Sequence, residues 1–425
     1  MRALYDFSLL VYQSLIRIAG LWMPKAKAWL DGRKGLLDSL EDQLAGPDTH
    51  SVWMHCASLG EFEQGRPVLE AIRKAYPGHK IVLTFFSPSG YEIRKHFPGA
   101  DIVTYLPLDS RSNAERFIAI IRPRLAIFVK YEHWYHYLKV LEEKGVTSLL
   151  ISAIFRKGQP FFAPYGGFWR KMLGTYKAIF VQDEDSLRLL AGIGLSKYSH
   201  MAGDTRFDRV LTVAEDSEKI PALEQLTTGK KVVVAGSTWP ADEQLLAAYA
   251  ENHKDTILII APHEIHEAHL ASLEDLFSMS IRFSKLRVMP EASRPDTISQ
   301  TDHQVVIIDN IGLLSKLYRY AGVAYIGGGF NKSGIHNILE AAVYGVPVVF
   351  GPTHHKSREA LDLLGSGGAF TISDATGLSN VLDRLFSEPK VLHAKGLANK
   401  EYVHRESGAT GRILSFIQEN RLLTS

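Results

Sequence analysis

The stretch Val323–Ala342 reads VAYIGGGFNKSGIHNILEAA. An apolar run is followed by three consecutive glycines, and an apolar helical pattern begins near Gly334–Ile335. A buried strand that passes through a glycine loop into a helix is typical of open parallel sheets, and such loops let the backbone approach a ligand closely. The spacing is neither the GxGxxG fingerprint of NAD-binding domains nor a Walker A sequence. We therefore predict a nucleotide-binding loop of another kind.

The same alternation of short apolar runs and amphipathic stretches extends from this loop toward both ends of the chain. Strands that alternate with helices predict βαβ units and a parallel sheet covered on both faces. A polar stretch, 214–230, separates two sets of runs, which predicts two α/β domains in series. The expected strands are Val52–Ala57, Lys80–Phe86, Leu125–Val129, Ser148–Ser152 and Ala178–Gln182, then Lys231–Gly236, Thr256–Ala261, Gln304–Ile308, Val323–Ile326 and Pro347–Phe350.

Length and composition fit this division. A chain of 425 residues is too long for one ordinary core and suits two domains of roughly 200 residues each. We predict an N-terminal segment over 1–35, a first domain over 36–213, a linker over 214–230 and a second domain over 231–425. Lysine and arginine number 48 against 46 acidic residues, which argues against a nucleic-acid-binding protein. With one cysteine and no CxxC or HExxH spacing, the sequence offers no metal-binding motif.

The first segment differs from the rest of the chain. Residues 3–23 read ALYDFSLLVYQSLIRIAGLWM, and only ten residues separate Asp6 from Arg17, well short of the roughly 20 apolar residues that span a bilayer. Polar side chains fall mainly on one helical face, large apolar ones occupy the others, and Lys25 and Lys27 follow. Such a helix is typical of segments that lie in the membrane surface. The alternative is a helix packed on the protein's own domain.

Two loops of the first domain carry candidate catalytic carboxylates. The first strand ends in Ser58-Leu59-Gly60-Glu61, where Gly60 permits a tight turn and Glu61 lands at a helix start. The helix dipole favours the charged form of a carboxylate there, as a general base requires. An ordinary helix-start glutamate is the alternative. The third expected strand leads into charged and aromatic residues, among them Glu132 and Trp134, which suits a polar site lined by aromatics as well as a solvated helix start.

Loops of the second domain suit a nucleotide. The helix after the glycine loop offers free N–H groups and the positive end of its dipole to a phosphate. Glu340, about a turn and a half into that helix, is placed to accept both hydroxyls of a ribose. Other strand ends carry Ser237-Thr238, Pro262-His263 and Gly312. Because the carboxyl ends of parallel strands meet at one sheet edge, these loops together predict a pocket.

The ordered set of motifs resembles the Kdo transferases, which move 3-deoxy-D-manno-octulosonic acid (Kdo) from CMP-Kdo to a lipid A precursor. The resemblance covers nearly the whole chain and implies a GT-B fold, with two Rossmann-like domains facing a cleft. It implies an acceptor-side first domain, a CMP-sugar-binding second domain and a final helix, 408–421, that crosses back to the first domain. The residues that carry it are Ser58–Glu61, Glu132, Trp134, Gly203–Asp208, Ser237, Thr238, Ala261, Pro262, Gly312 and Gly327–Glu340.

The resemblance also implies a mechanism and a location. The family is inverting and needs no metal or other cofactor; Glu61 would be the general base, and Glu132 and Arg206 would support the transition state. The implied acceptor is lipid IVA, in lipopolysaccharide biosynthesis at the cytoplasmic face of the bacterial inner membrane. Contacts with the substrates and CMP are expected from Ser58, Gly60, Ser237, Thr238, Pro262, His263, Gly312, Leu313, Leu314, Gly328, Gly329, His336, Asn337, Ile338, Leu339 and Glu340.

The sequence departs from the family pattern at five positions. His263 stands where arginine is usual, Arg206 where lysine is usual, and Leu313 where glutamate is usual. Trp239 replaces a histidine and Tyr135 a proline. These departures bear on the cytidine and phosphate contacts and leave the expected base and the nucleotide helix intact.

Three alternatives share parts of this pattern. Another GT-B transferase, using a UDP-sugar and a lipid or peptidoglycan acceptor, has the same two-domain plan but tends to place glycines or a histidine at the turn of Ser58–Glu61. A non-catalytic protein that binds nucleotide sugars would be expected to lack Glu61 or the glycine-rich loop. A GT-B epimerase would act on a soluble UDP-sugar and would not need the N-terminal segment.

Overall fold

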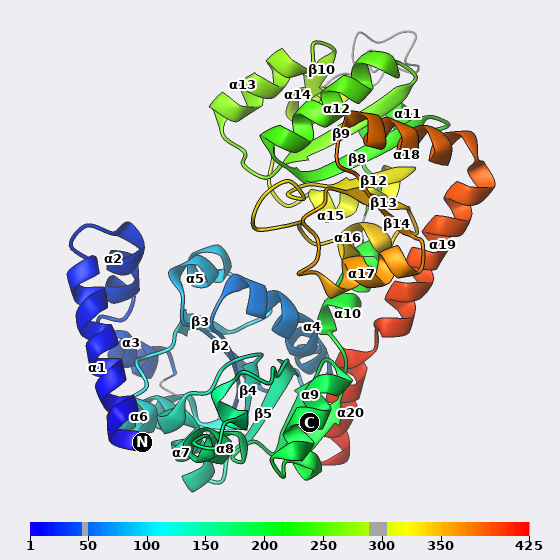
Figure 1. Ribbon diagram of the computed structural model, residues 1–425. Helices are drawn as coiled ribbons and strands as arrows, with labels where there is room; N and C mark the ends of the chain where they lie inside the picture. Colours follow the sequence, from blue (N-terminus) through cyan, green and yellow to red (C-terminus); the bar gives the residue numbers. More distant parts are fainter. Residues whose placement is uncertain (45–49, 217, 289–303, 425) are drawn as a thin grey trace. The chain divides into compact units, whose positions relative to one another are not determined.

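The computed structural model of the chain describes residues 1–44, 50–216, 218–288 and 304–424. The chain divides into two compact units: unit 1 is residues 1–209 with 407–425, and unit 2 is residues 210–406. Each unit is built on one sheet of seven strands that all run parallel (Figure 1). The predicted α/β class, with two Rossmann-like parallel-sheet domains, is confirmed.

The sheet of unit 1 contains the first seven strands. They are β1 (Ser51–Cys56), β2 (Lys80–Phe85), β3 (Ile102–Tyr105), β4 (Pro123–Val129), β5 (Thr147–Ala153), β6 (Ala178–Val181) and β7 (Ser199–Met201). Their order is β3-β2-β1-β4-β5-β6-β7, so the direction in which the chain adds strands reverses between β1 and β4. Every residue of β1 is buried, because both faces are covered, and this explains its continuous apolar run.

The helices of unit 1 form two layers. They are α1 (Arg2–Ala19), α2 (Pro24–Asp31), α3 (Leu36–Gln43), α4 (Leu59–Ala75), α5 (Pro88–Arg94), α6 (Arg111–Ile121), α7 (Tyr135–Glu143), α8 (Gly167–Leu173), α9 (Glu184–Gly192), α10 (Thr205–Asp216), α20 (Ala409–Glu419), and the 3-10 helices η1 (Pro160–Phe162) and η2 (Ser196–Tyr198). One core cluster includes Phe117 and Tyr137 from α6 and α7. The other includes Phe62 from α4 and Ile413 and Ile417 from α20.

Unit 2 repeats the plan. Its strands are β8 (Lys231–Thr238), β9 (Thr256–Pro262), β10 (Ser280–Arg282), β11 (Val305–Ile307), β12 (Val323–Ile326), β13 (Val348–Phe350) and β14 (Ala369–Thr371). Their order is β10-β11-β9-β8-β12-β13-β14, with the reversal between β8 and β12. Its helices are α11 (Pro221–Thr227), α12 (Pro240–Asn252), α13 (Glu267–Leu276), α14 (Phe283–Val288), α15 (Leu314–Leu317), the 3-10 helix η5 (Tyr318–Tyr320), α16 (Leu339–Ala342), α17 (Arg358–Gly365), α18 (Ala375–Ser387) and α19 (Pro389–Glu406).

The boundary between the units falls inside a helix. Unit 2 begins at Val210, within α10, and the stretch expected to be a linker, 214–230, holds the end of α10 and all of α11. Leu223 and Leu226 of α11 are buried, so the polarity of this stretch comes from the outer faces of two helices. The final helix, α20, packs on unit 1, where Asp208 accepts hydrogen bonds from the backbone N–H groups of Gly408 and Thr410 at 2.6 Å each.

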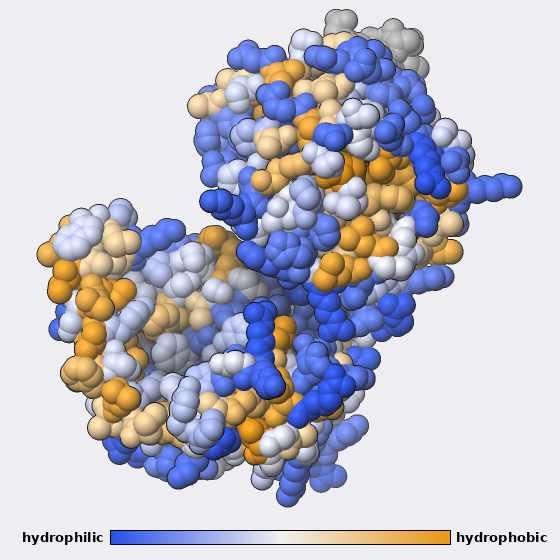
Figure 2. Space-filling view, in the orientation of Figure 1, coloured by the Kyte–Doolittle hydropathy of each residue, from blue (hydrophilic) through white to orange (hydrophobic). Residues whose placement is uncertain are grey.

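The N-terminal helix α1 has a packed side and an exposed side. On the packed side the Tyr5 hydroxyl donates to Asp109, and Asp6 contacts the Nε2 atom of His136 at 2.6 Å. The exposed side is a strip of apolar residues that continues past the helix end (Figure 2), and we call it the apolar strip: Leu4, Phe7, Leu10, Val11, Leu15, Ile18, Leu21 and Trp22. In the described part of the chain, no helix combines the length and apolarity needed to cross a membrane.

Candidate functional site

The predicted site residues gather at the carboxyl ends of the strands, where ligands of open α/β sheets bind. In unit 1, Glu61 follows β1 and Glu132 follows β4, the two strands between which the order reverses. Arg206 follows the edge strand β7. In unit 2 the predicted residues lie at or after the ends of β8, β9, β11 and β12. Both reversal points therefore carry predicted site residues.

Glu61 is the third residue of α4 and closes a capping box with Ser58. The Ser58 backbone N–H donates to Glu61 Oε2 at 2.8 Å, the Ser58 hydroxyl donates to the same oxygen at 3.1 Å, and the Glu61 N–H donates to Ser58 Oγ at 3.4 Å. This reciprocal pair satisfies two N–H groups that a helix start leaves open. Glu61 is therefore a helix-start glutamate, and one of its two oxygens is committed to that role.

The protonation of Glu61 depends on its surroundings more than on the helix. Burial and the nearby carboxylate of Glu132 raise the pKa of Glu61 above its ordinary value, against the smaller lowering effects of the Ser58 hydrogen bonds and of His55. The sequence predicts the opposite direction, because it shows the helix start and hides the burial. A raised pKa makes the carboxylate a stronger proton acceptor, which suits a general base.

Gly60 has a different role from the one predicted. It is the second residue of α4, its φ angle is not positive, and a Cβ placed on it would meet no atom within 4 Å. The backbone therefore does not require glycine for a turn. The exposed Gly60 instead leaves space open beside Glu61 at the helix start.

Glu132 is buried and held by three contacts. Its Oε2 atom accepts from the Trp134 indole N–H and lies 3.0 Å from Nε2 of His55. The Tyr176 hydroxyl donates to the Glu132 backbone carbonyl at 2.5 Å. A buried carboxylate is costly unless such donors surround it. The loop after β4 is thus a fixed polar site and does not match a solvated helix start.

His55 is a site residue that sequence reasoning missed. It lies in β1, is completely buried, and its Nδ1 atom is 2.8 Å from Thr84 Oγ1, which accepts from the Trp53 indole N–H at 2.8 Å. If the Thr84 hydroxyl proton points to Nδ1, then Nε2 carries the ring proton and donates it to Glu132. The available signal was a single histidine inside an otherwise apolar strand.

The motif Gly203–Asp208 mostly anchors helices. The Thr205 hydroxyl donates to the Gln64 carbonyl of α4 at 2.5 Å, and Asp208 caps α20. Arg206 is held by Asp204, whose carboxylate accepts from Nε of Arg206 at 2.8 Å and lies 2.6 Å from its Nη2 atom. The Arg206 side chain is 34% exposed, so a guanidinium remains accessible at the start of α10, beside α4.

Three aromatic side chains of unit 2 converge from three strand ends. Trp239 and His263 stack with ring centroids 4.6 Å apart, and His263 and His336 are 4.5 Å apart. The Trp239 indole N–H donates to Nε2 of His336 at 3.3 Å. Burial, and then the proximity of His263, lower the pKa of His336, which favours the neutral ring that can accept this bond. Two departures from the family pattern, Trp239 and His263, therefore contact each other.

The ends of β8 and β9 are packed together. Thr238 pairs with Pro262 in the sheet register, and both are buried. The Thr238 hydroxyl donates to Glu243 at 2.9 Å, and Ser237 has a φ angle of 53°. Of the predicted contacts at these strand ends, Ser237 and the exposed His263 are the side chains that are not fully buried.

The glycine-rich loop is shaped by the protein's own backbone. A Cβ at Gly327 would lie 2.2 Å from the Ser237 carbonyl oxygen, and one at Gly329 would lie 2.5 Å from the Gly351 nitrogen. Gly328 has a φ angle of 89°, which favours glycine. These glycines let loops approach one another, and the predicted close approach to a ligand is not needed to explain them.

Asp242, at the start of α12, ties this loop to β8 and was also missed. Its buried carboxylate accepts from the Gly328 N–H at 2.9 Å, the Tyr325 hydroxyl at 2.7 Å and the Trp239 N–H at 3.0 Å. Burial raises the pKa of Asp242, and the three donors act in the opposite direction. The Gly328 N–H therefore already has a hydrogen-bond partner within the protein.

The helix after the glycine loop starts later than predicted. It begins at Leu339, not near Gly334–Ile335, and places Glu340 in its first turn. Asn337 accepts from the Leu339 N–H at 3.2 Å, and its amide donates to Glu340 Oε1 at 3.0 Å. Asn337 and Glu340 are therefore hydrogen-bonded neighbours at the surface, while Ile338 and Leu339 are buried.

The loop after β11 lies at the same carboxyl edge of the unit 2 sheet. Gly312 is exposed, with a φ angle of 93° and open space around it. Leu313 and Leu314, partly buried, begin α15. Across the described residues of both units, no group of three or more histidine, cysteine, aspartate or glutamate side chains is arranged to hold a metal ion.

Comparison with known proteins finds one family model and several named relatives. Residues 30–209 match the family model of 3-deoxy-D-manno-octulosonic-acid transferase (kdotransferase). The chain is 27% identical to the 3-deoxy-D-manno-octulosonic acid transferase of Chlamydophila psittaci, over 86% of this chain and 84% of that one. It is 24% identical to the transferase of the same name from Haemophilus influenzae, over 88% and 87%. It also matches a bifunctional glycosyltransferase/methyltransferase of Fusobacterium nucleatum at 24% identity over 88% of this chain, and spans 56% of that protein's length.

Solved structures share the architecture. A putative UDP-N-acetylglucosamine 2-epimerase of Listeria monocytogenes superposes with a TM-score of 0.60 at 14% identity, over 89% of this chain and 98% of that one. MurG of Acinetobacter baumannii gives 0.52 at 12% identity, over 88% and 100%. These likenesses show the GT-B fold alone. The family model and the named relatives show that residues 30–209 form a domain of the 3-deoxy-D-manno-octulosonic acid transferase family and that the chain is a glycosyltransferase.

Proposed function

We propose that the chain transfers Kdo from CMP-Kdo to lipid IVA in lipopolysaccharide biosynthesis, with inversion and without a metal or other cofactor. The observation that carries this proposal is the pair of carboxylates, Glu61 and Glu132, at the reversal point of the unit 1 sheet, where burial and then the neighbouring Glu132 raise the pKa of Glu61. The family gives the sugar and the reaction class. The resemblance to transferases that act on lipid A precursors gives the acceptor.

Glu61 acts as the general base in this proposal. Its Oε2 atom accepts from Ser58, whereas Oε1 has no hydrogen-bond partner within the described ranges and is left for the acceptor hydroxyl. That hydroxyl gives its proton to Glu61 while its oxygen bonds to the anomeric carbon of Kdo. The bond from that carbon to the CMP phosphate breaks with its electron pair. Attack opposite the leaving CMP inverts the anomeric centre, and a monophosphate leaving group carries less charge for a metal to neutralise than a diphosphate.

Two further residues of unit 1 support the transition state. Positive charge develops on the sugar ring as the bond to phosphate breaks, and the buried carboxylate of Glu132, fixed by His55 and Trp134, supplies a preorganised negative charge. Negative charge develops on the phosphate. Arg206, partly exposed at the start of α10, offers the compensating cation.

The donor nucleotide is assigned to the carboxyl edge of the unit 2 sheet. The stacked rings of Trp239, His263 and His336 offer faces on which a pyrimidine can pack. Glu340, oriented by Asn337, accepts the ribose hydroxyls. The remaining predicted contacts at Ser237, at 312–314 and at the glycine-rich loop line the same edge.

The N-terminal helices suit attachment to the cytoplasmic face of the bacterial inner membrane. The apolar strip leaves Phe7 62% exposed and Trp22 67% exposed, and burying such side chains in the headgroup region is favourable. Exposed Lys25 and Lys27 follow on α2, where anionic lipids would attract them.

The proposal is tested with the purified full chain, CMP-Kdo and a tetraacyl lipid A precursor, with and without a chelator. CMP release and the mass of the lipid are followed together. A gain of one or more Kdo units in both conditions is the expected result. CMP release without a lipid product would reject lipid IVA as acceptor. Turnover with a UDP-sugar and none with CMP-Kdo would reject the donor assignment, and loss of activity in the chelator would reject metal independence.

A further inference from the structure

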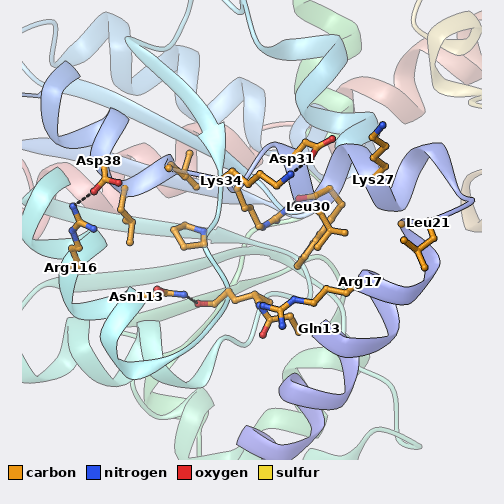
Figure 3. A pocket seen from close by; sticks show the side chains of 18 residues that line it. Gln13, Arg17, Leu21, Lys27, Leu30, Asp31, Lys34, Asp38, Asn113 and Arg116 are labelled. Atoms are coloured by element: carbon orange, nitrogen blue, oxygen red, sulfur yellow. Dashed lines mark hydrogen bonds and ion pairs between the residues drawn. The ribbon is translucent and has the colours of Figure 1, made fainter.

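A cavity of about 640 Å³ lies between the N-terminal helices and the loop that joins β3 to α6. Figure 3 shows its lining, which comes from α1, α2, α3, the residues between α2 and α3, and the start of α6. None of the predicted catalytic or nucleotide-binding residues takes part. The volume falls in the range of small-molecule sites. All of its lining belongs to unit 1.

Positive charge prevails around this cavity. Its lining holds five cationic side chains and two anionic ones, a difference of +3. Two cations are paired within the lining: Lys34 contacts Asp31 at 2.6 Å, and Arg116 contacts Asp38 at 2.6 Å. A third, Arg33, is directed away from any ligand, because it donates to the backbone carbonyls of Trp29, Phe86 and Leu106.

The two cations that remain are Arg17 and Lys27. Neither has a hydrogen-bond or ion-pair partner among the residues that the structure describes. In Figure 3, Arg17 reaches from α1 into the cavity toward Asn113 and Gln13, while Lys27 and Leu21 stand at its other end. The Asn113 amide donates to the Leu108 carbonyl at 2.9 Å, so the polar end of the cavity is rigid and presents hydrogen-bond donors beside the unpaired guanidinium.

The remaining lining is largely apolar. It includes Leu30, Leu36, Leu37 and Pro107. Leu21, which is 81% exposed, is shared by the cavity lining and the apolar strip of α1. If α1 docks on a membrane through the apolar strip, the cavity opens at the membrane surface. It offers hydrogen-bond donors to an anionic group and an apolar wall to an acyl chain.

We propose that this cavity binds one phospholipid with an anionic headgroup, drawn from the bilayer. Its phosphodiester contacts Arg17 at the polar end of the cavity, and an acyl chain lies along the leucines toward Leu21. The supply of this lipid rests on the membrane attachment proposed above, whereas the binding itself does not. A lipid held in this way would fix the N-terminal helices on an anionic membrane in addition to the apolar strip.

The test measures binding of soluble dioctanoyl phosphatidylglycerol to the full chain by native mass spectrometry and calorimetry, without donor or acceptor. Arg17→Gln removes the cation inside the cavity, and Lys25→Gln removes an equal charge from an exposed position on α2 that does not line it. Leu37→Trp fills the apolar part without a change of charge. Dioctanoyl phosphatidylcholine and inorganic phosphate are the comparison ligands, and thermal unfolding monitors the fold of each variant.

We expect a one-to-one adduct with phosphatidylglycerol that Arg17→Gln weakens by about tenfold or more, the scale of a lost charge-assisted hydrogen bond. Leu37→Trp should weaken it comparably and Lys25→Gln hardly at all. Equal effects of Arg17→Gln and Lys25→Gln, or equal binding of phosphatidylcholine or inorganic phosphate, would overturn the proposal. Attachment by α1 is measured separately, as partition into phosphatidylcholine vesicles, so the two ideas fail independently.

Discussion

At the scale of single residues, Glu61 combines a structural role with the proposed role of general base. One carboxylate oxygen closes the capping box of α4, and in the proposal the other receives the proton of the acceptor hydroxyl. The sequence placed Glu61 correctly because a strand followed by a helix start is a local pattern. It did not reveal His55 or Asp242, because their partners Glu132 and Gly328 lie 77 and 86 positions away. A buried polar network is set by the fold and leaves little trace in local sequence.

Replacing Glu61 by glutamine separates its two roles. Glutamine keeps the capping-box acceptor but cannot take a proton, so we expect transfer to fall about 10²- to 10⁴-fold with CMP binding and the free energy of unfolding nearly unchanged. Initial rates with CMP-Kdo and chemical denaturation measure these quantities. Asp183→Ala is the control, because it removes the N-cap of α9 at a cost of about 1 kcal/mol and should leave transfer intact. Near-wild-type turnover in Glu61→Gln would reject this residue as the base.

The pH dependence of transfer should report the coupling between Glu61 and Glu132. The base acts in its ionised form, so kcat/KM falls as the pH drops through the pKa of Glu61. Glu132 raises that pKa, and Glu132→Gln should therefore move the acidic limb to lower pH, besides reducing the maximal rate. Glu70→Gln, on the same helix in an ion pair with Arg66, should not move it. An unshifted limb in Glu132→Gln would show that another group controls the profile.

The raised pKa of Glu61, caused by burial and then by Glu132, also affects the stability of the fold. Because the pKa of Glu61 is raised in the folded state, the fold holds this proton more tightly than the unfolded chain does. Protonation of Glu61 therefore contributes to the free energy of unfolding. This contribution is complete below the pKa that Glu61 has in the unfolded chain, and it is lost as the pH rises through the pKa that Glu61 has in the folded state.

At the scale of elements, the glycine-rich loop shows the limit of pattern reading. Three glycines between a strand and a helical pattern predict a βα unit, and β12 and α16 form one. The helix starts at Leu339 because the preceding residues fold back on their neighbours, with the Ile335 N–H donating to the Thr353 carbonyl at 3.1 Å and the Thr353 N–H to Gly329 at 2.8 Å. Contacts with a later loop decide this boundary, so the local sequence could not.

The start of helix α20 is capped by a residue distant in sequence, Asp208. Asp208 accepts two N–H groups at its start, so Asp208→Ala should lower the free energy of unfolding by about 1–2 kcal/mol and speed hydrogen exchange in 409–419 above the rest of unit 1. Asp208→Asn, which keeps one of the two acceptor oxygens, should recover only part of the loss. Asp183→Ala should destabilise α9 without releasing α20. Unchanged exchange in α20 after Asp208→Ala would contradict this anchoring role.

Membrane attachment through the apolar strip is a property of α1. The double variant Phe7→Ser/Leu15→Ser removes two exposed apolar side chains. Burying these two side chains in the membrane would contribute a few kcal/mol, so we expect partition of the double variant into phosphatidylcholine vesicles to fall about tenfold or more. Folding stability should change by less than about 0.5 kcal/mol. Leu361→Ser, also exposed but in unit 2, is the control for partition. Equal partition of all three proteins would exclude α1 as the attachment surface.

At the scale of the whole molecule, the chain is two parallel-sheet units that each gather polar residues at a reversal point. The number and class of the units were predictable because alternating apolar runs report buried parallel strands. The division between them lies at Val210, shortly before the stretch 214–230 predicted as a linker, and this stretch holds the end of α10 and all of α11. The departures Trp239 and His263 became intelligible only in three dimensions, where they stack on each other. In the proposed function, the carboxylates of unit 1 act on the acceptor and the loops of unit 2 bind the donor nucleotide.

The anomeric configuration of the product tests that reaction most directly. The full chain is incubated with CMP-Kdo and the tetraacyl lipid A precursor in a chelator, and the product is characterised by NMR. The account predicts a lipid that carries Kdo with the configuration opposite to that in the donor, as direct displacement by a hydroxyl deprotonated by Glu61 requires. A retained configuration, or no lipid product, would contradict it.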